Sequence, residues 1–167
     1  PRPATRSQLQ QILESIGKAP ALRRAVCLGA YAGLRVHEAA ALHWHDINLE
    51  LRRITVLGKG RKRRLVAISR TLVDELLPDT GGNVVTGTDH ANSADALRRR
   101  VNRAIANAGV DVTFHQLRHR FGTLAYQAEK DLVAVRDMMG HASITTTQCY
   151  AAANASIADR IAEAVTE

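Results

Sequence analysis

The sequence has few cysteines and no long apolar segment. Its two cysteines, Cys27 and Cys149, form no CxxC pattern, so nothing indicates an oxidising compartment. No apolar segment approaches the ~20 residues that a transmembrane helix needs, and no secretory signal peptide opens the chain. We therefore expect a cytoplasmic protein without a membrane partner. The first residues, PRPATRSQL, have the composition of a linker, and we expect a preceding domain to be absent.

Lysine is scarce as well, although the chain is strongly basic. Only four of its 23 basic residues are lysines, and the net charge is +7, which favours a polyanionic partner. Abundant arginine alone proves little, because a GC-rich genome also produces it. The placement is more informative, since eight basic residues and no acid lie within residues 51–70, and a second cluster covers 98–103. One cluster is as often a solvated face as a binding surface, but two in a small domain favour nucleic acid.

The chain is long enough for one compact domain, with 167 residues of which 46% are hydrophobic. Apolar residues at helical spacing, capping residues and glycines predict mainly helices. There is no internal repeat and no clear domain boundary. In the first half of the chain, helices are predicted at residues 7–16, in a buried segment that ends near Gly33, in RVHEAAALHW and at residues 71–77. In the second half, they are predicted at residues 93–108, after the capping residues Thr113, Asp131 and Ser143, and in the terminal segment ASIADRIAEAV.

A β-hairpin is predicted from the segment RRITVLGKGRKRRLVAIS. Ile54 and Val56 alternate with their neighbours on the first strand, as do Leu65 and Ala67 on the second, which is typical of strands with one apolar face. Two glycines between the strands favour a turn with a basic tip. One further short strand is predicted at residues 83–86. The expected fold class is therefore α+β, a mainly helical single domain with a small antiparallel β-sheet.

The segment TFHQLRHRFGT combines histidines and arginines with an apolar stripe. On a helix, His115 and Arg118 share one face. Leu117, Phe121 and Leu124 line a neighbouring face that would meet the core. The polar pair is either a solvated basic face or a site for an anion.

A metal site is a third interpretation of these histidines, since His115 and His119 have the i, i+4 spacing of two ligands on one helix face. The sequence lacks the glutamate of an HExxH motif, however, and no cysteine or carboxylate is placed to complete the site. His43 and His45 lie too close together on a predicted turn to contribute. We therefore expect no metal and no cofactor.

Four segments carry the charged and nucleophilic candidates in a characteristic order. They are AGLRVHEAAALHW with Arg35, LGKGRKRR with Lys59, HQLRHRFGT with His115 and Arg118, and MMGHASITTTQCY with His141 and Tyr150. In this order they resemble the catalytic domain of the tyrosine recombinases, the phage integrase and Xer family. Each motif is weak alone, but the four together are highly specific. The resemblance implies the tyrosine-recombinase catalytic fold for residues 1–167, with a tail helix in 151–167 and the N-terminal DNA-binding domains absent from this chain.

The resemblance implies a site-specific recombinase that cleaves and rejoins DNA without a metal. Arg35 and Arg118 would clamp the scissile phosphate, because planar guanidiniums offer parallel donors to its oxygens. His141 would add a third donor. Fixed donors aimed at developing charge can replace a metal ion.

The same resemblance implies that Tyr150 is the nucleophile and forms a covalent 3′-phosphotyrosyl intermediate. A free phenol has a pKa of about 10, so Tyr150 needs a proton acceptor or a strongly positive site, and His115 is the best candidate to help there. Lys59 would protonate the leaving deoxyribose oxygen. We interpret Tyr31 and Tyr126 as core or structural residues.

Two further residues have supporting roles in the family pattern. Glu38, three residues after Arg35, would support the active site, although a solvated glutamate or an ion pair with a neighbouring arginine explains it nearly as well. His119 fits the LRH pattern beside Arg118. The residues expected to contact DNA are Arg61, Lys62, Arg63, Arg64, Arg98, Arg99 and Arg100.

The tail carries an apolar stripe of Ile157, Ile161 and Val165, spaced four apart. The stripe packs either on its own domain or, as the resemblance suggests, on a neighbouring protomer of a homotetramer on DNA. Further expected partners are double-stranded DNA and a DNA-bending accessory protein.

Three functions stay open at this point. We favour a phage or mobile-element integrase, with an Xer-type chromosome-dimer resolvase as the rival within the family. A DNA-binding module without catalysis is the alternative from another class, and the intact set of six candidate residues argues against it. Any of them would act on the nucleoid of a bacterial or phage-infected cell.

Overall fold

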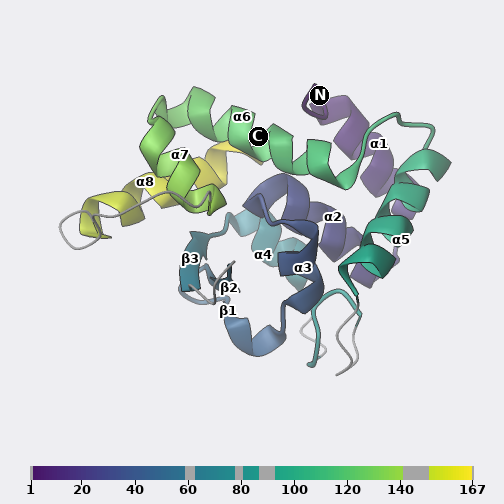
Figure 1. Ribbon diagram of the computed structural model, residues 1–167, viewed down its shortest axis with the longest axis horizontal. Coiled ribbons are helices and arrows are strands. Elements are labelled where there is room, and N and C mark those ends of the chain that lie inside the picture. The colour runs from purple at the N-terminus through teal and green to yellow at the C-terminus, as the bar shows by residue number, and fades with distance from the viewer. Residues whose placement is uncertain (1, 59–62, 78–80, 87–92, 141–150, 167) are drawn as a thin grey trace.

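The computed structural model describes residues 2–58, 63–77, 81–86, 93–140 and 151–166. In this part of the chain, helices form most of the domain and a small sheet lies at one side of them (Figure 1), which confirms the expected fold class. None of the described helices combines the length and the apolarity needed to cross a bilayer. The elements are α1 (Arg6–Ile16), α2 (Pro20–Ala32), α3 (Val36–Ala41), the 3₁₀ turn η1 (Trp44–Asp46), β1 (Ile47–Asn48), β2 (Arg53–Leu57), β3 (Arg63–Ala67), α4 (Arg70–Leu76), α5 (Ala94–Asn107), α6 (Phe114–Glu129), α7 (Leu132–Met139) and α8 (Ala151–Ala164).

The apolar helix α2 forms the centre of the domain and packs against α6, which crosses above it in Figure 1. Pro20 begins α2 at a position where its missing N–H is not needed. Gly33 ends it with a φ of +63°, and a Cβ at that position would lie 2.5 Å from the ring of Phe121. Only glycine satisfies both the backbone conformation and the close approach of α6.

The sheet has the antiparallel order β1–β2–β3. Ile54 pairs with Val66 and Val56 with Arg64, so these four residues lie on one face of the sheet. The expectation that Leu65 shares the apolar face is wrong, because this register turns Leu65 outward, where it is 65% exposed. Ala67 lies on the same outer face and is buried there.

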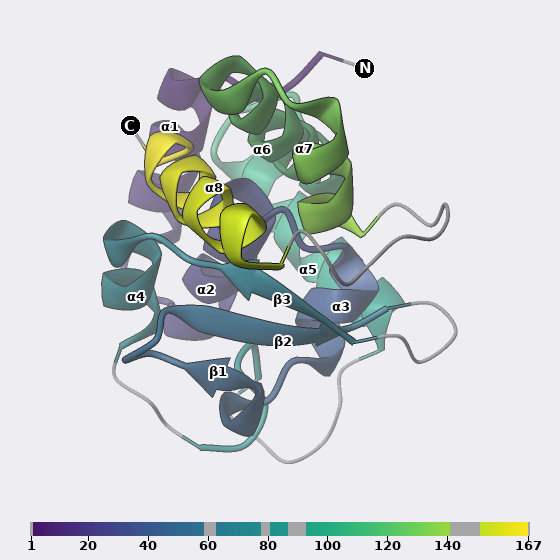
Figure 2. The ribbon, with the colours of Figure 1, turned by 90° about the vertical axis from the view of Figure 1, so that its left-hand side faces the viewer.

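The tail helix α8 packs on its own domain, lying alongside β3 in Figure 2 and against α6. Ile161 and Val165 are fully buried in a cluster with Phe121 and Ala67, and Ile157 packs against that cluster. Ion pairs join α8 to the start of β2 and to α6: Arg52–Glu163, Arg53–Asp159 and Glu129–Arg160. The apolar stripe of the tail thus packs on its own domain in the single chain, and not on a neighbouring protomer.

Two local predictions differ from the structure. The helix in RVHEAAALHW ends at Ala41, and the 3₁₀ turn follows, because Trp44 pairs its backbone N–H with the carbonyl of Gly82. The strand expected at residues 83–86 is only an isolated bridge between His43 and Asn83. The predicted short helix that carries Tyr150 lies outside the described residues.

Candidate active site

The site is built around the carboxylate of Glu38, in the first turn of α3. Arg35 is the N-cap residue of this helix, and its backbone N–H donates to Oε2 of Glu38 at 2.7 Å. A carboxylate at this position also complements the positive end of the helix dipole. The Glu38 side chain is fully buried, so it needs partners for its charge and its lone pairs. The simple alternative of a solvated glutamate is therefore wrong.

Arg64 of β3 is the main partner of Glu38. Its Nη1 and Nη2 donate to Oε1 and Oε2 at 2.7 and 3.0 Å, a parallel pair of hydrogen bonds. Arg35 adds a bond from Nη1 to Oε1 at 3.2 Å. Burial by itself would raise the pKa of Glu38, but the hydrogen bonds and charges of Arg64 and Arg35 outweigh burial and hold the pKa below its usual range. Glu38 is thus a carboxylate at neutral pH.

Arg118 of α6 approaches the same carboxylate from the other side, with Nη1 at 3.9 Å from Oε2 of Glu38. It donates to the carbonyl of Gly33 and, at 2.8 Å, to that of Met139. Its side chain is only 5% exposed. Burial and the repulsion of Arg35 lower the pKa of Arg118 to about 10, with Glu38 opposing them, and it remains protonated at neutral pH.

The three arginines also converge on the C-terminal end of α7. The carbonyls of Met138, Met139 and Gly140 accept from Arg64, Arg118 and Arg35 respectively, at 3.1, 2.8 and 3.0 Å. These carbonyls stand at a helix end, where no helical N–H satisfies the last ones and where the dipole favours cations.

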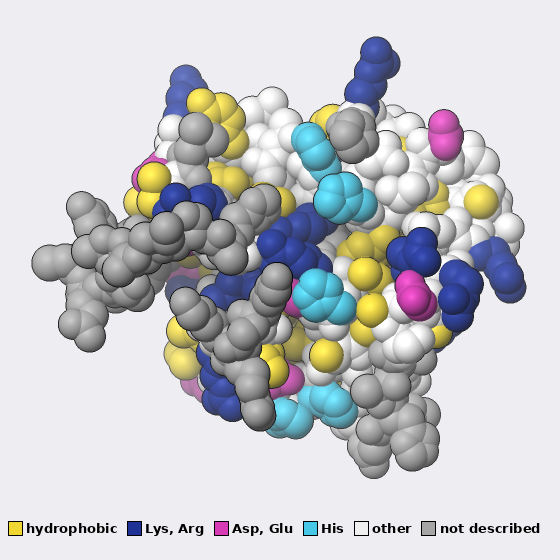
Figure 3. Space-filling view, in the orientation of Figure 1, with side chains coloured by type: hydrophobic (Ala, Val, Ile, Leu, Met, Phe, Trp, Pro, Cys, Tyr) yellow, Lys and Arg dark blue, Asp and Glu magenta, His cyan; other side chains and the backbone are white. Residues whose placement is uncertain are grey.

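The local charge is strongly positive, with three guanidiniums around one carboxylate. Arg35 is the most exposed of the three, at 31% of its side chain. Figure 3 shows Lys and Arg side chains gathered in the middle of this face of the molecule, with histidines beside them. Such an arrangement attracts an anion that presents several oxygens.

The remaining candidates fall into three groups. His115, in the first turn of α6, is exposed, and His119 lies within 3.3 Å of the Thr123 hydroxyl through Nδ1. Arg63 is exposed on β3, and Arg98, Arg99 and Arg100 are exposed on α5. Outside the described residues lie Lys59, Arg61, Lys62, His141 and Tyr150.

Arg64 is the residue whose place the sequence did not reveal. The sequence pattern places it among the basic residues expected to contact DNA, yet the register of the hairpin turns it inward opposite Val56. The strand alternation contains the signal, because Arg64 and Val66 occupy alternate positions on β3. Among the described residues, no group of three histidine, cysteine or acidic side chains is arranged to hold a metal ion.

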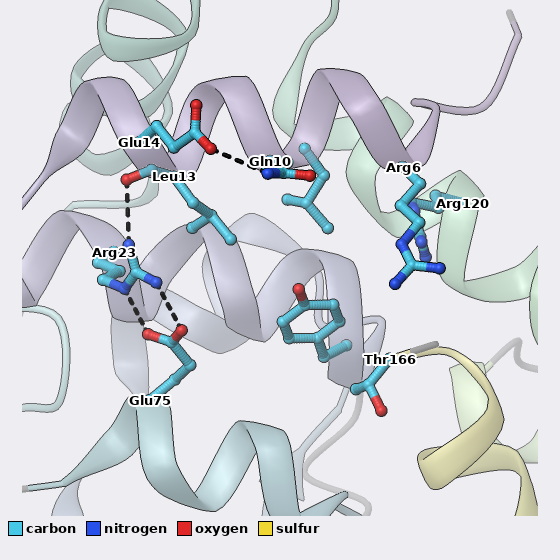
Figure 4. Close-up of a pocket in the computed structure, with 10 residues that line it drawn as sticks. Arg6, Gln10, Leu13, Glu14, Arg23, Glu75, Arg120 and Thr166 are labelled. Carbon is cyan, nitrogen blue, oxygen red and sulfur yellow. Dashed lines mark hydrogen bonds and ion pairs between the residues drawn. The ribbon is translucent and has the colours of Figure 1, made fainter.

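A separate cavity of about 380 Å³ lies between α1, α2, α4 and α6 (Figure 4). Several of its charged groups have protein partners: Arg23 donates to both carboxylate oxygens of Glu75 and to the carbonyl of Leu13. Arg120 donates to the carbonyl of Val165 at 3.0 Å. These contacts tie helices together and share no residue with the Glu38 site.

Comparison with known proteins gives a consistent result. The sequence model described as "Phage integrase family" matches residues 4–156. Tyrosine recombinase XerC of Xanthomonas campestris pv. campestris is 36% identical in an alignment of 129 positions, which covers 71% of this chain and 40% of that protein. The chain thus spans less than half the length of this curated relative.

Solved structures agree. The integrase from mycobacterium phage Brujita superposes with a TM-score of 0.81 at 28% identity, over 96% of this chain and 58% of that one. The XerH site-specific recombinase, in a post-cleavage complex with its palindromic difH substrate, superposes with a TM-score of 0.66 at 29% identity, over 86% and 47% of the two chains.

Proposed function

Since the chain belongs to the phage integrase family of tyrosine recombinases, we propose that it is the catalytic part of a site-specific DNA recombinase. The observation that carries the proposal is the meeting of Arg35 and Arg118 beside the buried carboxylate of Glu38. Two guanidiniums held in fixed positions suit the non-bridging oxygens of a phosphodiester, on which charge accumulates during in-line displacement.

In this proposal, Tyr150 attacks the scissile phosphorus. The bond from the phenol oxygen to phosphorus forms as the bond to the deoxyribose 5′-oxygen breaks, leaving a 3′-phosphotyrosyl linkage. His115 accepts the phenol proton, Lys59 gives a proton to the leaving oxygen, and His141 donates to the phosphate. Attack by a second 5′-hydroxyl reverses these steps and rejoins the DNA, so the cycle needs no ATP.

The proposed substrate is double-stranded DNA, which agrees with the substrate complex of the similar XerH and with the net charge of +7. Joining two duplexes requires four strand cuts, and we propose a homotetramer on DNA, acting at the nucleoid with a DNA-bending accessory protein. A phage or mobile-element integrase is our preferred role, because the superposition on the phage Brujita integrase covers most of the chain. An Xer-type resolvase is the second candidate, favoured by the XerC relative.

The test is covalent trapping on a nicked suicide substrate, from which the cut strand cannot be rejoined. The wild type should form a protein–DNA adduct, and Tyr150→Phe should form none while binding DNA with unchanged affinity, because only the attacking oxygen is lost. Tyr126→Phe is the matched control, since Tyr126 is an exposed tyrosine of α6, and it should form the adduct normally. A wild type that binds DNA but never forms an adduct would establish the non-catalytic module instead.

A further inference from the structure

We propose that Arg64 is a positioning residue that keeps Arg35 and Arg118 available for the phosphate, by occupying Glu38 and by holding the end of α7. This inference rests on the proposed function and gives Arg64 a different role from a DNA contact.

The contacts of Arg64 join three parts of the fold. The residue lies on β3, its two terminal nitrogens hold Glu38 of α3, and its Nε donates to the carbonyl of Met138 in α7. Each of its three nitrogens therefore donates within the protein. A side chain so engaged is poorly placed to bind a DNA backbone.

The bidentate contact determines what Glu38 does to its other neighbours. Glu38 receives two parallel bonds from Arg64, while Arg118 stands off at 3.9 Å. Without Arg64, the buried carboxylate would keep its charge and attract Arg118 into a direct ion pair. Arg118 would then turn from the carbonyl of Met139 and from the phosphate position. Arg64 prevents this competition.

The contact with Met138 extends the same role to the segment that follows. Arg64, Arg118 and Arg35 bind three successive carbonyls at the end of α7. The residue after this turn, His141, is a proposed phosphate donor. Fixing the turn against the arginines therefore fixes the starting point of the segment that leads to His141 and Tyr150.

Lysine cannot replace Arg64 in this arrangement, because an ammonium is a single point of charge and cannot bond both carboxylate oxygens in parallel while reaching a carbonyl. The first test is Arg64→Lys, measured by single-turnover cleavage of the suicide substrate and by DNA affinity. We expect cleavage to slow by about 10- to 100-fold, as for a misplacement of catalytic groups, with DNA affinity within about twofold of wild type. Arg136→Lys is the control, because the side chain of Arg136 in α7 is 39% exposed and bonds Asp137, and the cleavage rate of this variant should not change.

The second test separates positioning from a general structural role. Arg64→Met leaves Glu38 without its main partner, and Glu38→Gln in the same chain removes the competing charge. The double variant should cleave faster than Arg64→Met alone. If a thermal melt shows that Arg64→Met does not fold, the cleavage rate of Arg64→Lys decides whether Arg64 positions the other two arginines.

Three outcomes would overturn the inference. They are a wild-type cleavage rate in Arg64→Lys, no recovery in a folded double variant, or weaker DNA binding with a salt slope reduced by about one, which is the signature of a lost phosphate contact. All three presuppose that the wild type forms the adduct. An inactive wild type would instead contradict the proposed function.

Discussion

The backbone of Gly140 lies directly against the guanidinium of Arg64. A Cβ built on Gly140 would stand 2.8 Å from Cζ and from Nη1 of Arg64, and the φ of Gly140 is +64°. A side chain at position 140 would therefore be strained in its backbone and would displace an arginine that Glu38 holds by two bonds. The glycine ends α7 and at the same time makes room for the site.

Gly140→Ala should consequently impair both stability and cleavage. The left-handed backbone costs roughly 1–2 kcal/mol for a residue with a Cβ, and the displacement of Arg64 adds to this. Gly109→Ala is the matched control, because Gly109 also has a positive φ, +70°, but its Cβ would meet only Gln11 at 3.8 Å. Urea unfolding should show a larger loss for Gly140→Ala than for Gly109→Ala, and only the former should slow adduct formation. Equal losses, with normal cleavage in both, would mean that Arg64 moves aside freely.

The buried carboxylate of Glu38 predicts a specific acid sensitivity. Its pKa in the folded protein lies below the ordinary value of 4.5, because the bonds and charges of Arg64 and Arg35 outweigh the effect of burial. The folded state then binds fewer protons at this group than the unfolded state does. Its stabilising contribution is therefore complete above about pH 4.5 and is lost as the pH falls through the folded pKa.

Glu38→Gln should remove this dependence. At neutral pH the free energy of unfolding of the variant should be lower by on the order of 3 kcal/mol, because a buried pair loses one charge. The difference in free energy of unfolding between variant and wild type should narrow below about pH 4.5. Urea unfolding at a series of pH values measures it. Glu14→Gln, at an exposed position on α1, should follow the wild-type curve. A gap that stays constant down to pH 3 would show that the charge of Glu38 contributes little.

Much of the fold follows from local sequence patterns. The start of α5 is predictable because the Ser93 hydroxyl accepts from the backbone N–H of Ala96. Gly33 ends α2 in the left-handed conformation, as a glycine after an apolar helix indicates. Arg35, Glu38 and Arg118 were recognised from motifs, and the structure brings these three together.

Apolarity does not predict the inward position of Arg64, although its alternation with Val66 along β3 is consistent with that position. Four consecutive basic residues precede Leu65, so apolarity alone suggested Leu65 as the buried one. The register pairs Arg64 with Val56 instead, and an inward arginine is stable only because Glu38, 26 residues earlier, meets it. The acceptors at the end of α7 are backbone carbonyls, which carry no signature in the sequence.

DNA cleavage should continue in excess EDTA. The proposed clamp places the charges of Arg35 and Arg118 where a metal enzyme would use a cation, and these charges cannot be chelated. Adduct formation on the suicide substrate, measured with and without EDTA, should give equal rates. Loss of activity that added Mg²⁺ or Zn²⁺ restores would contradict the prediction and favour a metal site at His115 and His119.

The tail helix should be part of the stable core of the isolated domain. Ile161 is fully buried against Phe121 and its neighbours, and truncation of such a side chain costs about 2–5 kcal/mol. Ile161→Ala should therefore lower the free energy of unfolding by that amount. Leu65→Ala is the control, because Leu65 is 65% exposed, and it should change stability by about 0.5 kcal/mol or less.

Deletion of residues 156–167 should then unfold or strongly destabilise the domain, since it removes Ile161 and Val165 together with the partners of Arg52 and Arg53. Circular dichroism and thermal melting of the truncated chain measure this directly. A truncated domain that stays folded and cleaves a single site, yet fails to join two sites, would show that the tail acts on a neighbouring protomer. In that case the tail helix would have two positions. In the isolated domain Ile161 would pack on its own core, and in the assembly on DNA it would pack on a neighbouring protomer.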